Sequence, residues 1–167
     1  MWPLAARIIC IDKSIKTKPL TVALWYGRSK EPDSLDEYLN PFVEEYRALM
    51  DGFTVKNQIF KSKIRFCIAD GQGRAWLKQV NPPNSKVCCE RCLILSYCFR
   101  KRMVFSVGDE WVKRTDVPFK AKSDELYHKG TSTLETIMDM INQFPLKPLH
   151  LIDLGVMKRI LKFLLEP

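Results

Sequence analysis

The chain has 167 residues, of which 46% are hydrophobic and 28% are charged. This length allows one domain with a substantial core and is too short for two ordinary domains, and the composition excludes a disordered or collagen-like chain. Lys and Arg total 27 against 19 Asp and Glu, which gives a net charge of +8. Such an excess favours an acidic partner, such as nucleic acid or an anionic surface.

The sequence contains no run that approaches the roughly 18–20 apolar residues needed to span a bilayer. The apolar start at residues 1–10 is short and lacks both a basic leading segment and a clear cleavage site, so we do not expect a signal peptide. Four of the six cysteines lie between Cys88 and Cys98, a clustering that suits a metal site in a reducing compartment better than a disulfide framework. We therefore expect no membrane association and a nuclear or cytoplasmic location.

The first half of the chain alternates predicted strands and helices. Two apolar, β-branched segments, 4–11 and 20–26, are separated by a polar stretch and predict a hairpin. Ser34 and Glu37 have the form of a capping box and open a predicted helix over 35–50, which Pro41 should kink or restart. Further on, the pattern predicts two strands and a short helix, at 53–61, 63–68 and 74–80.

The second half is basic and more irregular. From Lys78 to Lys122 the chain holds ten Lys and Arg against four Asp and Glu, whereas residues 31–51 carry a net charge of −6. Helical spacing returns moderately at 133–144 and clearly at 151–165. Strands that come first and helices that come later predict an α/β fold, or an α+β fold, with a mixed sheet.

Asp70 is the first candidate for chemistry. It follows a predicted strand and precedes Gly71-Gln72-Gly73, and carboxylates at strand ends are common in active sites. A two-metal site needs several such carboxylates, so a single Asp does not make one. The structural alternative is an Asp that caps the following turn or helix.

The second candidate is a metal site built on Cys89-Glu90-Arg91-Cys92. This spacing places two thiolates on one tetrahedral ion, and Zn²⁺ then needs two more ligands. The chain has two histidines, so the preferred set is Cys89, Cys92, His128 and His150, with Cys88 or Cys98 as substitutes for one histidine. The alternatives are a redox pair of cysteines and histidines that are packed or surface residues.

The third candidate is a nucleic-acid contact surface. Arg100, Lys101 and Arg102 lie beside Tyr97 and Phe99, and basic residues interleaved with aromatic rings suit phosphate contact and base stacking. Further along, the cluster continues with Lys113 and Arg114. The alternative is a solvated basic loop.

Five motifs follow one another in an informative order along the chain. They are DGQGRAWL at 70–77, CERC at 89–92, RTDVPF at 114–119, HKGTSTL at 128–134 and FPLKPLHLIDLGVMKR at 144–159. This succession resembles the transposase-domain proteins of animal genomes, relatives of the CACTA-type cut-and-paste DNA transposases. The resemblance covers nearly the whole chain.

The resemblance implies a ribonuclease H-like core that uses a D-D-E set of acids and two Mg²⁺ ions for DNA strand transfer. Residues 1–80 would be a partial core, in which 63–69 is its fourth strand and Asp70 matches the second acid. Residues 81–167 would be a basic, mostly helical insertion that contains the cysteines and histidines and a zinc-type site.

The chain departs from this family at the other two acids. The resemblance places the first acid before the Trp2-Pro3 strand and the third beyond Pro167, and Lys147 stands where the D-x-x-H motif has its acid. We therefore expect a transposon-derived fragment that is inactive in strand transfer alone and binds DNA or a partner. The alternatives are a domesticated zinc-containing nucleic-acid or protein-interaction module, and an active Mg²⁺-dependent strand transferase whose missing acids come from elsewhere. The sequence does not indicate an oligomeric state.

Overall fold

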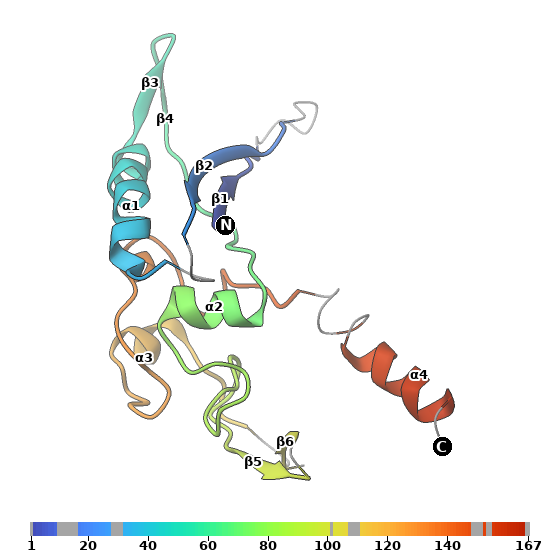
Figure 1. The fold of residues 1–167 in the computed structure, drawn as a ribbon. Coiled ribbons are helices and arrows are strands. Elements are labelled where there is room, and N and C mark those ends of the chain that lie inside the picture. The colour runs from blue at the N-terminus through green and yellow to red at the C-terminus, as the bar shows by residue number, and fades with distance from the viewer. Residues whose placement is uncertain are drawn as a thin grey trace. The chain divides into compact units, whose positions relative to one another are not determined.

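The computed structural model describes residues 2–9, 17–27, 32–100, 102–106, 111–147, 152 and 155–165. The chain divides into two compact units, Met1–Ser62 and Lys63–Pro167. Each unit contains both helices and strands, so the α/β character expected from the sequence is confirmed (Figure 1). Within the described ranges no helix combines the length and the apolar character that crossing a bilayer requires.

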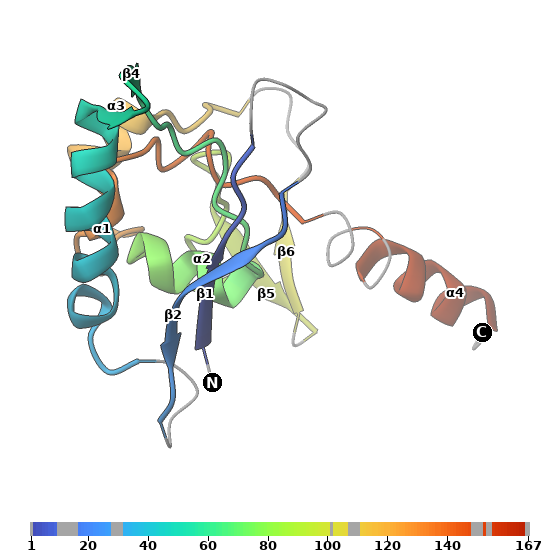
Figure 2. The same ribbon diagram turned by 90° about the horizontal axis from the view of Figure 1, so that it is seen from above.

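The first unit begins with the expected hairpin. Strand β1 (Trp2–Ala6) pairs antiparallel with β2 (Leu20–Trp25), with a register shift between Leu4 and Ala5, and the two run side by side in Figure 2. A second hairpin follows the helix of this unit and consists of β3 (Phe53–Val55) and β4 (Gln58–Phe60). It turns through residues 56 and 57, both of which have positive φ, as a tight two-residue hairpin turn requires.

Helix α1 (Leu35–Asp51) forms as the capping pattern predicts. The Ser34 hydroxyl accepts a hydrogen bond from the Glu37 amide at 3.2 Å, which satisfies one of the free N–H groups at the helix start. Leu39 and Val43, one turn apart, are buried. The expected restart at Pro41 is wrong, because a single helix continues through this residue to Asp51.

The predicted strand over 63–68 is absent. Residues 61–70 have no regular secondary structure, and the segment is tied to a distant part of the same unit instead. The Cys67 amide donates to the Gln143 carbonyl at 2.8 Å, and the Gln143 side-chain amide donates to the Ile64 carbonyl. These isolated bonds hold an extended chain without a strand ladder beside it.

The mixed sheet expected from the sequence is also wrong for the described part of the chain. Its strands form three separate two-stranded sheets, all of them antiparallel. The third sheet belongs to the second unit and pairs β5 (Ser96–Phe99) with β6 (Arg102–Phe105), inside the stretch that the sequence pattern predicts to be irregular. The alternating pattern of Tyr97, Phe99 and Val104 around a basic turn is the signal for this hairpin in the sequence.

Helix α2 (Gly71–Lys78) starts three residues earlier than predicted, because Asp70 caps it. The helix ends at Gln79, whose φ of 53° is left-handed. Beyond it lie α3 (Asp116–Lys120), the 3₁₀ turn η1 (Thr133–Thr136) and α4 (Lys158–Leu165). In its described residues, the region from 81 onward therefore combines short helices with a hairpin and irregular chain, and these residues are not mostly helical.

The helix predicted over 133–144 shrinks to the four-residue η1. The Asp139 side chain explains this change, since one of its oxygens accepts from the amides of Ile141 and Asn142, both at 2.7 Å. A side chain that captures neighbouring amides replaces the helical hydrogen bonds with a local turn. The core of the second unit forms around this turn and is made mainly of Val80, Phe119, Tyr127, Leu134, Met138, Met140, Ile141 and Phe144.

Candidate functional site

The turn formed by Cys89–Cys92 connects several parts of the second unit. The Cys92 amide donates to the Cys89 sulfur at 3.3 Å, which closes the turn. Its outgoing end is fixed to the segment before α3, because the Leu93 amide donates to the Val112 carbonyl and the Arg114 amide donates to the Arg91 carbonyl. Two thiols that the sequence predicts as metal ligands therefore lie together on a well-anchored loop.

Glu90, within this turn, forms an ion pair with helix α2. Its carboxylate accepts from Arg74 Nε, at 3.0 Å to each oxygen, and from Arg74 Nη2 at 2.7 Å. The Glu90 side chain is 15% exposed and that of Arg74 is 8% exposed, so the pair is shielded from water. Lys78, one turn further along α2, places Nζ 3.6 Å from the same carboxylate.

Two further arginines anchor the turn to the rest of the core. Arg91 donates from Nη1 to the Ile141 carbonyl and from Nη2 to the Phe144 carbonyl, both at 2.6 Å. Arg114 donates from Nε to the Cys89 carbonyl at 2.9 Å and pairs with Asp124 at 2.7 Å, while its guanidinium lies 3.8 Å from the centre of the Tyr127 ring.

The prediction that Arg114 contacts nucleic acid does not fit this arrangement. The residue is buried, and its charge is neutralised by Asp124 and spread over an aromatic face. To reach a phosphate it would have to leave these partners inside the core, at a cost of several kcal/mol for the broken buried pair. We therefore assign Arg114 a structural role.

Lys78 is a buried cation with only partial compensation. Its residue is 1% exposed, and its ammonium lies 5.4 Å and 5.5 Å from the ring centres of Phe119 and Phe144. Burial lowers the pKa of Lys78 from 10.5 to about 8, although the nearby Glu90 carboxylate acts in the opposite direction. Because two arginines also repel it, this lysine gives up its proton far more readily than a surface lysine.

Burial raises the pKa of two cysteines at this turn, Cys92 and Cys88. Burial, and next to it the neighbouring Cys89 thiol, raises the pKa of Cys92, while Lys113 and Arg114 act to lower it. Cys88 is buried beside Ser96, with sulfur and hydroxyl oxygen 3.9 Å apart, and burial raises its pKa as well. A metal ion would have to displace these protons, so metal binding at this turn would depend on pH.

His128 is placed away from the cysteine pair. The backbone of His128 pairs with that of Val80 in an isolated antiparallel β-bridge. Its imidazole ring lies edge-on to the Phe119 ring, with the two ring centres 4.6 Å apart. Burial lowers the pKa of His128, and its Nδ1 is buried with no hydrogen-bond partner in the described part of the chain. This is the environment of a packed histidine in a core.

The predicted four-residue zinc site is not assembled in the described structure. Among the described residues, no three His, Cys, Asp or Glu side chains are grouped so that they could hold a metal, and this applies to Cys89, Cys92 and His128. The fourth predicted ligand, His150, lies outside the described residues. The two thiols thus fit half of a tetrahedral zinc site, and the described residues do not supply the other half.

Asp70 acts as the N-cap of α2. Its Oδ1 accepts from the Gly73 amide at 2.7 Å, and the Arg74 amide donates to its backbone carbonyl at 2.8 Å. The residue follows an irregular segment rather than a strand, and within the ranges described it belongs to no cluster of three acids. The sequence pattern places Asp70 correctly before a helix but wrongly at the end of a strand.

The predicted basic surface is partly visible on β5 and β6. Arg100 forms the turn of this hairpin, with a φ of 47°, and is exposed, as is Lys113. Lys101 lies outside the described residues, and only the backbone of Arg102 is described. Exposed Tyr97 and Phe99 precede the turn, and the Arg100 guanidinium lies 5.2 Å from the centre of the Phe99 ring.

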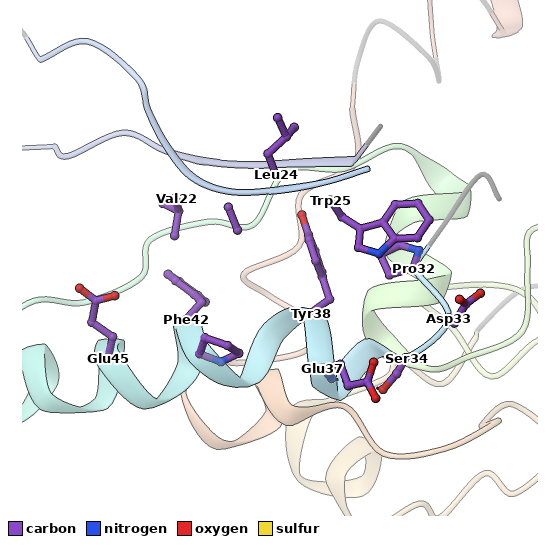
Figure 3. Close-up of a pocket in the computed structure, with 12 residues that line it drawn as sticks. Val22, Leu24, Trp25, Pro32, Asp33, Ser34, Glu37, Tyr38, Phe42 and Glu45 are labelled. Atoms are coloured by element: carbon purple, nitrogen blue, oxygen red, sulfur yellow. Dashed lines mark hydrogen bonds between the residues drawn. The ribbon is translucent and has the colours of Figure 1, made fainter. Parts of the chain in front are cut away.

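A separate cavity lies in the first unit, between β2 and α1. It has a volume of about 440 Å³ and is lined by the rings of Trp25, Tyr38 and Phe42, with the carboxylates of Glu37 and Glu45 at its rim (Figure 3). Burial raises the pKa of Tyr38. The cavity has an apolar interior and an acidic edge, and nothing in the sequence pattern points to it.

No family model, curated protein or solved structure matches the chain. The resemblance to transposase-domain proteins therefore rests on the order and spacing of the five motifs. The structure adds that several residues of these motifs, namely Arg74, Glu90, Arg114 and His128, lie in the same compact unit, in which Arg74 and Arg114 are buried.

The environment of Lys78 predicts a measurable pH dependence of stability. The unfolded chain keeps this proton up to a pH near 10.5, whereas the folded chain releases it near pH 8. Because the unfolded state binds more protons in this interval, the free energy of unfolding contributed by Lys78 should rise with pH from 8 to 10.5. Denaturant titrations of the wild type and of Lys78→Met, repeated across this range, measure the difference.

The wild type should gain stability relative to Lys78→Met as the pH increases. Cys67, whose pKa burial raises to about 11, titrates in both proteins and cancels in the difference. Parallel profiles for the two proteins would contradict the assignment of Lys78 as a destabilised buried cation.

Proposed function

We propose that the chain is a transposase-derived, DNA-binding fragment that does not carry out strand transfer on its own. The order of the five motifs supports the family assignment, and with it a partial ribonuclease H-like core joined to a basic insertion, in which the segment over 63–68 is extended chain in place of the core's fourth strand. The observation that carries the binding function is the run of three consecutive cations, Arg100 to Arg102, at the turn of the β5–β6 hairpin, where Arg100 is exposed.

Three consecutive cations, Arg100 to Arg102, stand at the turn of this hairpin, and the acids nearest to it in the sequence are Glu90 before it and Asp109 and Glu110 after it, the last two outside the described residues. Between residues 85 and 106 the chain has five basic residues and one acid, Glu90. Glu90 is paired with Arg74 in the interior and contributes nothing to neutralise the hairpin. Arg100 is exposed at the turn, directly before Lys101 and Arg102. A run of consecutive cations attracts a polyanion, because binding releases the counterions condensed on its phosphates.

The role of Asp70 as the cap of helix α2 supports the proposal that the chain does not carry out strand transfer on its own. Strand transfer with two Mg²⁺ ions needs several carboxylates that converge on the metals. Asp70 instead uses one oxygen to cap α2, and Lys147 stands where the family motif has an acid. A single carboxylate cannot neutralise two divalent cations.

A zinc-containing interaction module is the second candidate function. It is favoured by the pair of thiols at Cys89 and Cys92, which the backbone already holds together by the Cys92 amide and the Cys89 sulfur. Zn²⁺ at this turn would take these two thiolates and two ligands from outside the described residues, among which His150 is the candidate. The metal would then stabilise the loop from which the basic hairpin extends.

The proposed binding function predicts a salt-dependent affinity for duplex DNA. Replacing three hairpin cations in the variant Arg100→Asn/Lys101→Gln/Arg102→Gln should weaken binding about tenfold or more at low salt. It should also reduce the slope of log affinity against log salt by about 3, one unit for each phosphate that is no longer neutralised. Asn is chosen at position 100 because it tolerates the left-handed backbone there. Fluorescence anisotropy with a labelled duplex gives both quantities.

The matched control removes three exposed lysines elsewhere, in Lys56→Asn/Lys61→Gln/Lys129→Gln, with Asn again at a left-handed position. Both variants lose the same net charge, so equal loss of affinity would show a diffuse charge effect and contradict a hairpin site. The same samples, incubated with DNA and Mg²⁺, should show no cleavage. Mg²⁺-dependent cleavage that disappears in Asp70→Asn would establish an active nuclease and overturn the proposal.

The zinc candidate predicts one zinc ion for each chain, bound through the cysteine turn. Cys89→Ser should abolish zinc binding, whereas His128→Phe should retain it, because His128 packs against Phe119 away from the thiols. Cys98→Ser, at an exposed position, is the control. Elemental analysis of the purified proteins and the visible spectrum after cobalt substitution measure binding. A folded chain without zinc would rule this candidate out.

A further inference from the structure

The cavity between β2 and α1 in the first unit is lined by three aromatic rings that come from two elements (Figure 3). Tyr38 and Phe42 lie one turn apart on α1, so they stand on the same side of the helix, and both rings point toward β2. Trp25, the last residue of β2, completes the set, with Pro32 beside its indole. The three aromatic residues are half-buried, so part of their surface stays open to a ligand.

These rings are held in position by their neighbours in the first unit. Phe42 stacks on Tyr46, with ring centres 5.7 Å apart. The Trp25 indole lies over Gly27, where an added β-carbon would meet the ring at 2.1 Å, so any side chain at position 27 would displace the indole. Rings that are already positioned lose less conformational entropy when a ligand binds.

The rim of this cavity is acidic. Asp33, Glu37 and Glu45 line it and are exposed, and its lining contains no Lys, Arg or His. Among the described residues, none of these three carboxylates takes part in an ion pair. The segment 28–31, which carries two cations and one acid, lies outside the described residues and is not part of the site. The residues that line the cavity therefore favour a cation.

Aromatic rings with carboxylates at their rim suit one kind of cation in particular. The negative face of a ring attracts a cation, most strongly where water is excluded. A quaternary ammonium group has no N–H, so it leaves no donor unsatisfied between the rings. A primary ammonium or a guanidinium needs hydrogen-bond acceptors on several sides, which aromatic rings do not supply. An uncharged apolar ligand would gain nothing from the carboxylates.

The spacing of the carboxylates favours a peptide over a free quaternary amine. Glu37 and Glu45 lie two turns apart on the same side of α1, which corresponds to about 12 Å along the helix axis. One ammonium group cannot lie close to both. An extended peptide rises about 3.3 Å for each residue, so two cationic side chains about four residues apart on one peptide span this distance.

We propose that the cavity between β2 and α1 binds the trimethylated side chain of a lysine in a basic peptide, while a second Lys or Arg of that peptide lies along the acidic rim. The trimethylammonium group enters the space between the rings of Trp25, Tyr38 and Phe42. The cavity volume of about 440 Å³ lies within the range of about 300–1,000 Å³ that is usual for small-ligand sites. This site goes beyond the proposed DNA contact and does not rest on it.

The test measures binding of the full chain to three labelled Gly/Ala peptides by fluorescence anisotropy. Each peptide carries one Arg about four residues from its central position. The central residue is trimethyl-lysine, unmodified lysine, or a neutral analogue of trimethyl-lysine in which carbon replaces the ammonium nitrogen. The trimethyl-lysine peptide should bind about tenfold or more tightly than the neutral analogue, because the two have the same shape and differ only in charge, and about fivefold or more tightly than the lysine peptide.

Variants of the lining test the rings and the rim separately. Tyr38→Leu should weaken binding of the trimethyl-lysine peptide about fivefold or more, whereas Tyr38→Phe keeps a ring and should stay within about twofold of the wild type. Tyr26→Leu, which removes a ring that is 82% exposed and outside the lining, is the control. Circular dichroism confirms that each variant is folded, and the comparison of the three peptides on the wild type needs no variant.

The variant Glu37→Gln/Glu45→Gln should weaken binding of the trimethyl-lysine peptide about threefold or more at low salt. Its control, Asp36→Asn/Glu44→Gln, removes the same charge from exposed positions of α1 outside the lining and should weaken binding clearly less. Equal losses in the two variants would contradict a role for the rim carboxylates.

Equal affinities for the trimethyl-lysine peptide and its neutral analogue, or a folded Tyr38→Leu variant that binds like the wild type, would overturn the cation site. Tetramethylammonium chloride that competes as well as the unlabelled trimethyl-lysine peptide would overturn the assignment to a peptide. Absence of binding of the trimethyl-lysine peptide would overturn the whole proposal and leave the proposed DNA contact in place.

Discussion

The ion pair between Arg74 and Glu90 is the interaction on which the second unit depends. It joins helix α2 to the cysteine turn through short hydrogen bonds from two guanidinium nitrogens, in a place that water hardly reaches. Burying two charges is costly, and removing one partner leaves the other uncompensated. Lys78 makes the loss of Glu90 more costly, because it is a second buried cation that faces the same carboxylate. Loss of Glu90 would therefore leave two buried cations, Arg74 and Lys78, without their carboxylate.

The same network determines which cations remain for binding. Arg74, Lys78, Arg91 and Arg114 are all engaged with a carboxylate, with backbone carbonyls or with aromatic rings inside the unit. The cations of this region that remain for a partner therefore lie on the hairpin and its neighbours and not in the interior. A sequence count of basic residues overestimates the binding surface, since it does not separate cations that hold the fold from cations that face solvent.

Local features of the fold could be predicted from the sequence, and distant pairings could not. Ser34 and Asp70 cap helices through bonds to residues three positions away, which a short pattern reveals. Glu90 finds Arg74 across 16 residues, and Arg91 finds the Phe144 carbonyl across 53, so no local pattern identifies these charges as buried. The segment over 63–68 alternates apolar and polar residues, as a strand does. An extended chain without a partner strand places its side chains in the same alternating way, so this pattern does not distinguish the two.

Double-mutant-cycle measurement of the coupling between Arg74 and Glu90 tests the account most directly. Denaturant titration gives the free energies of unfolding of the wild type, Arg74→Met, Glu90→Leu and the double variant. We predict a loss of about 3–5 kcal/mol for Glu90→Leu, which leaves Arg74 and Lys78 without their carboxylate, and a smaller loss for Arg74→Met, in which Lys78 still faces Glu90. The double variant should lose clearly less than the sum of the two, because Arg74 is then no longer buried without a partner. Small and additive losses would show that the pair does not hold the cysteine turn, and would contradict this account.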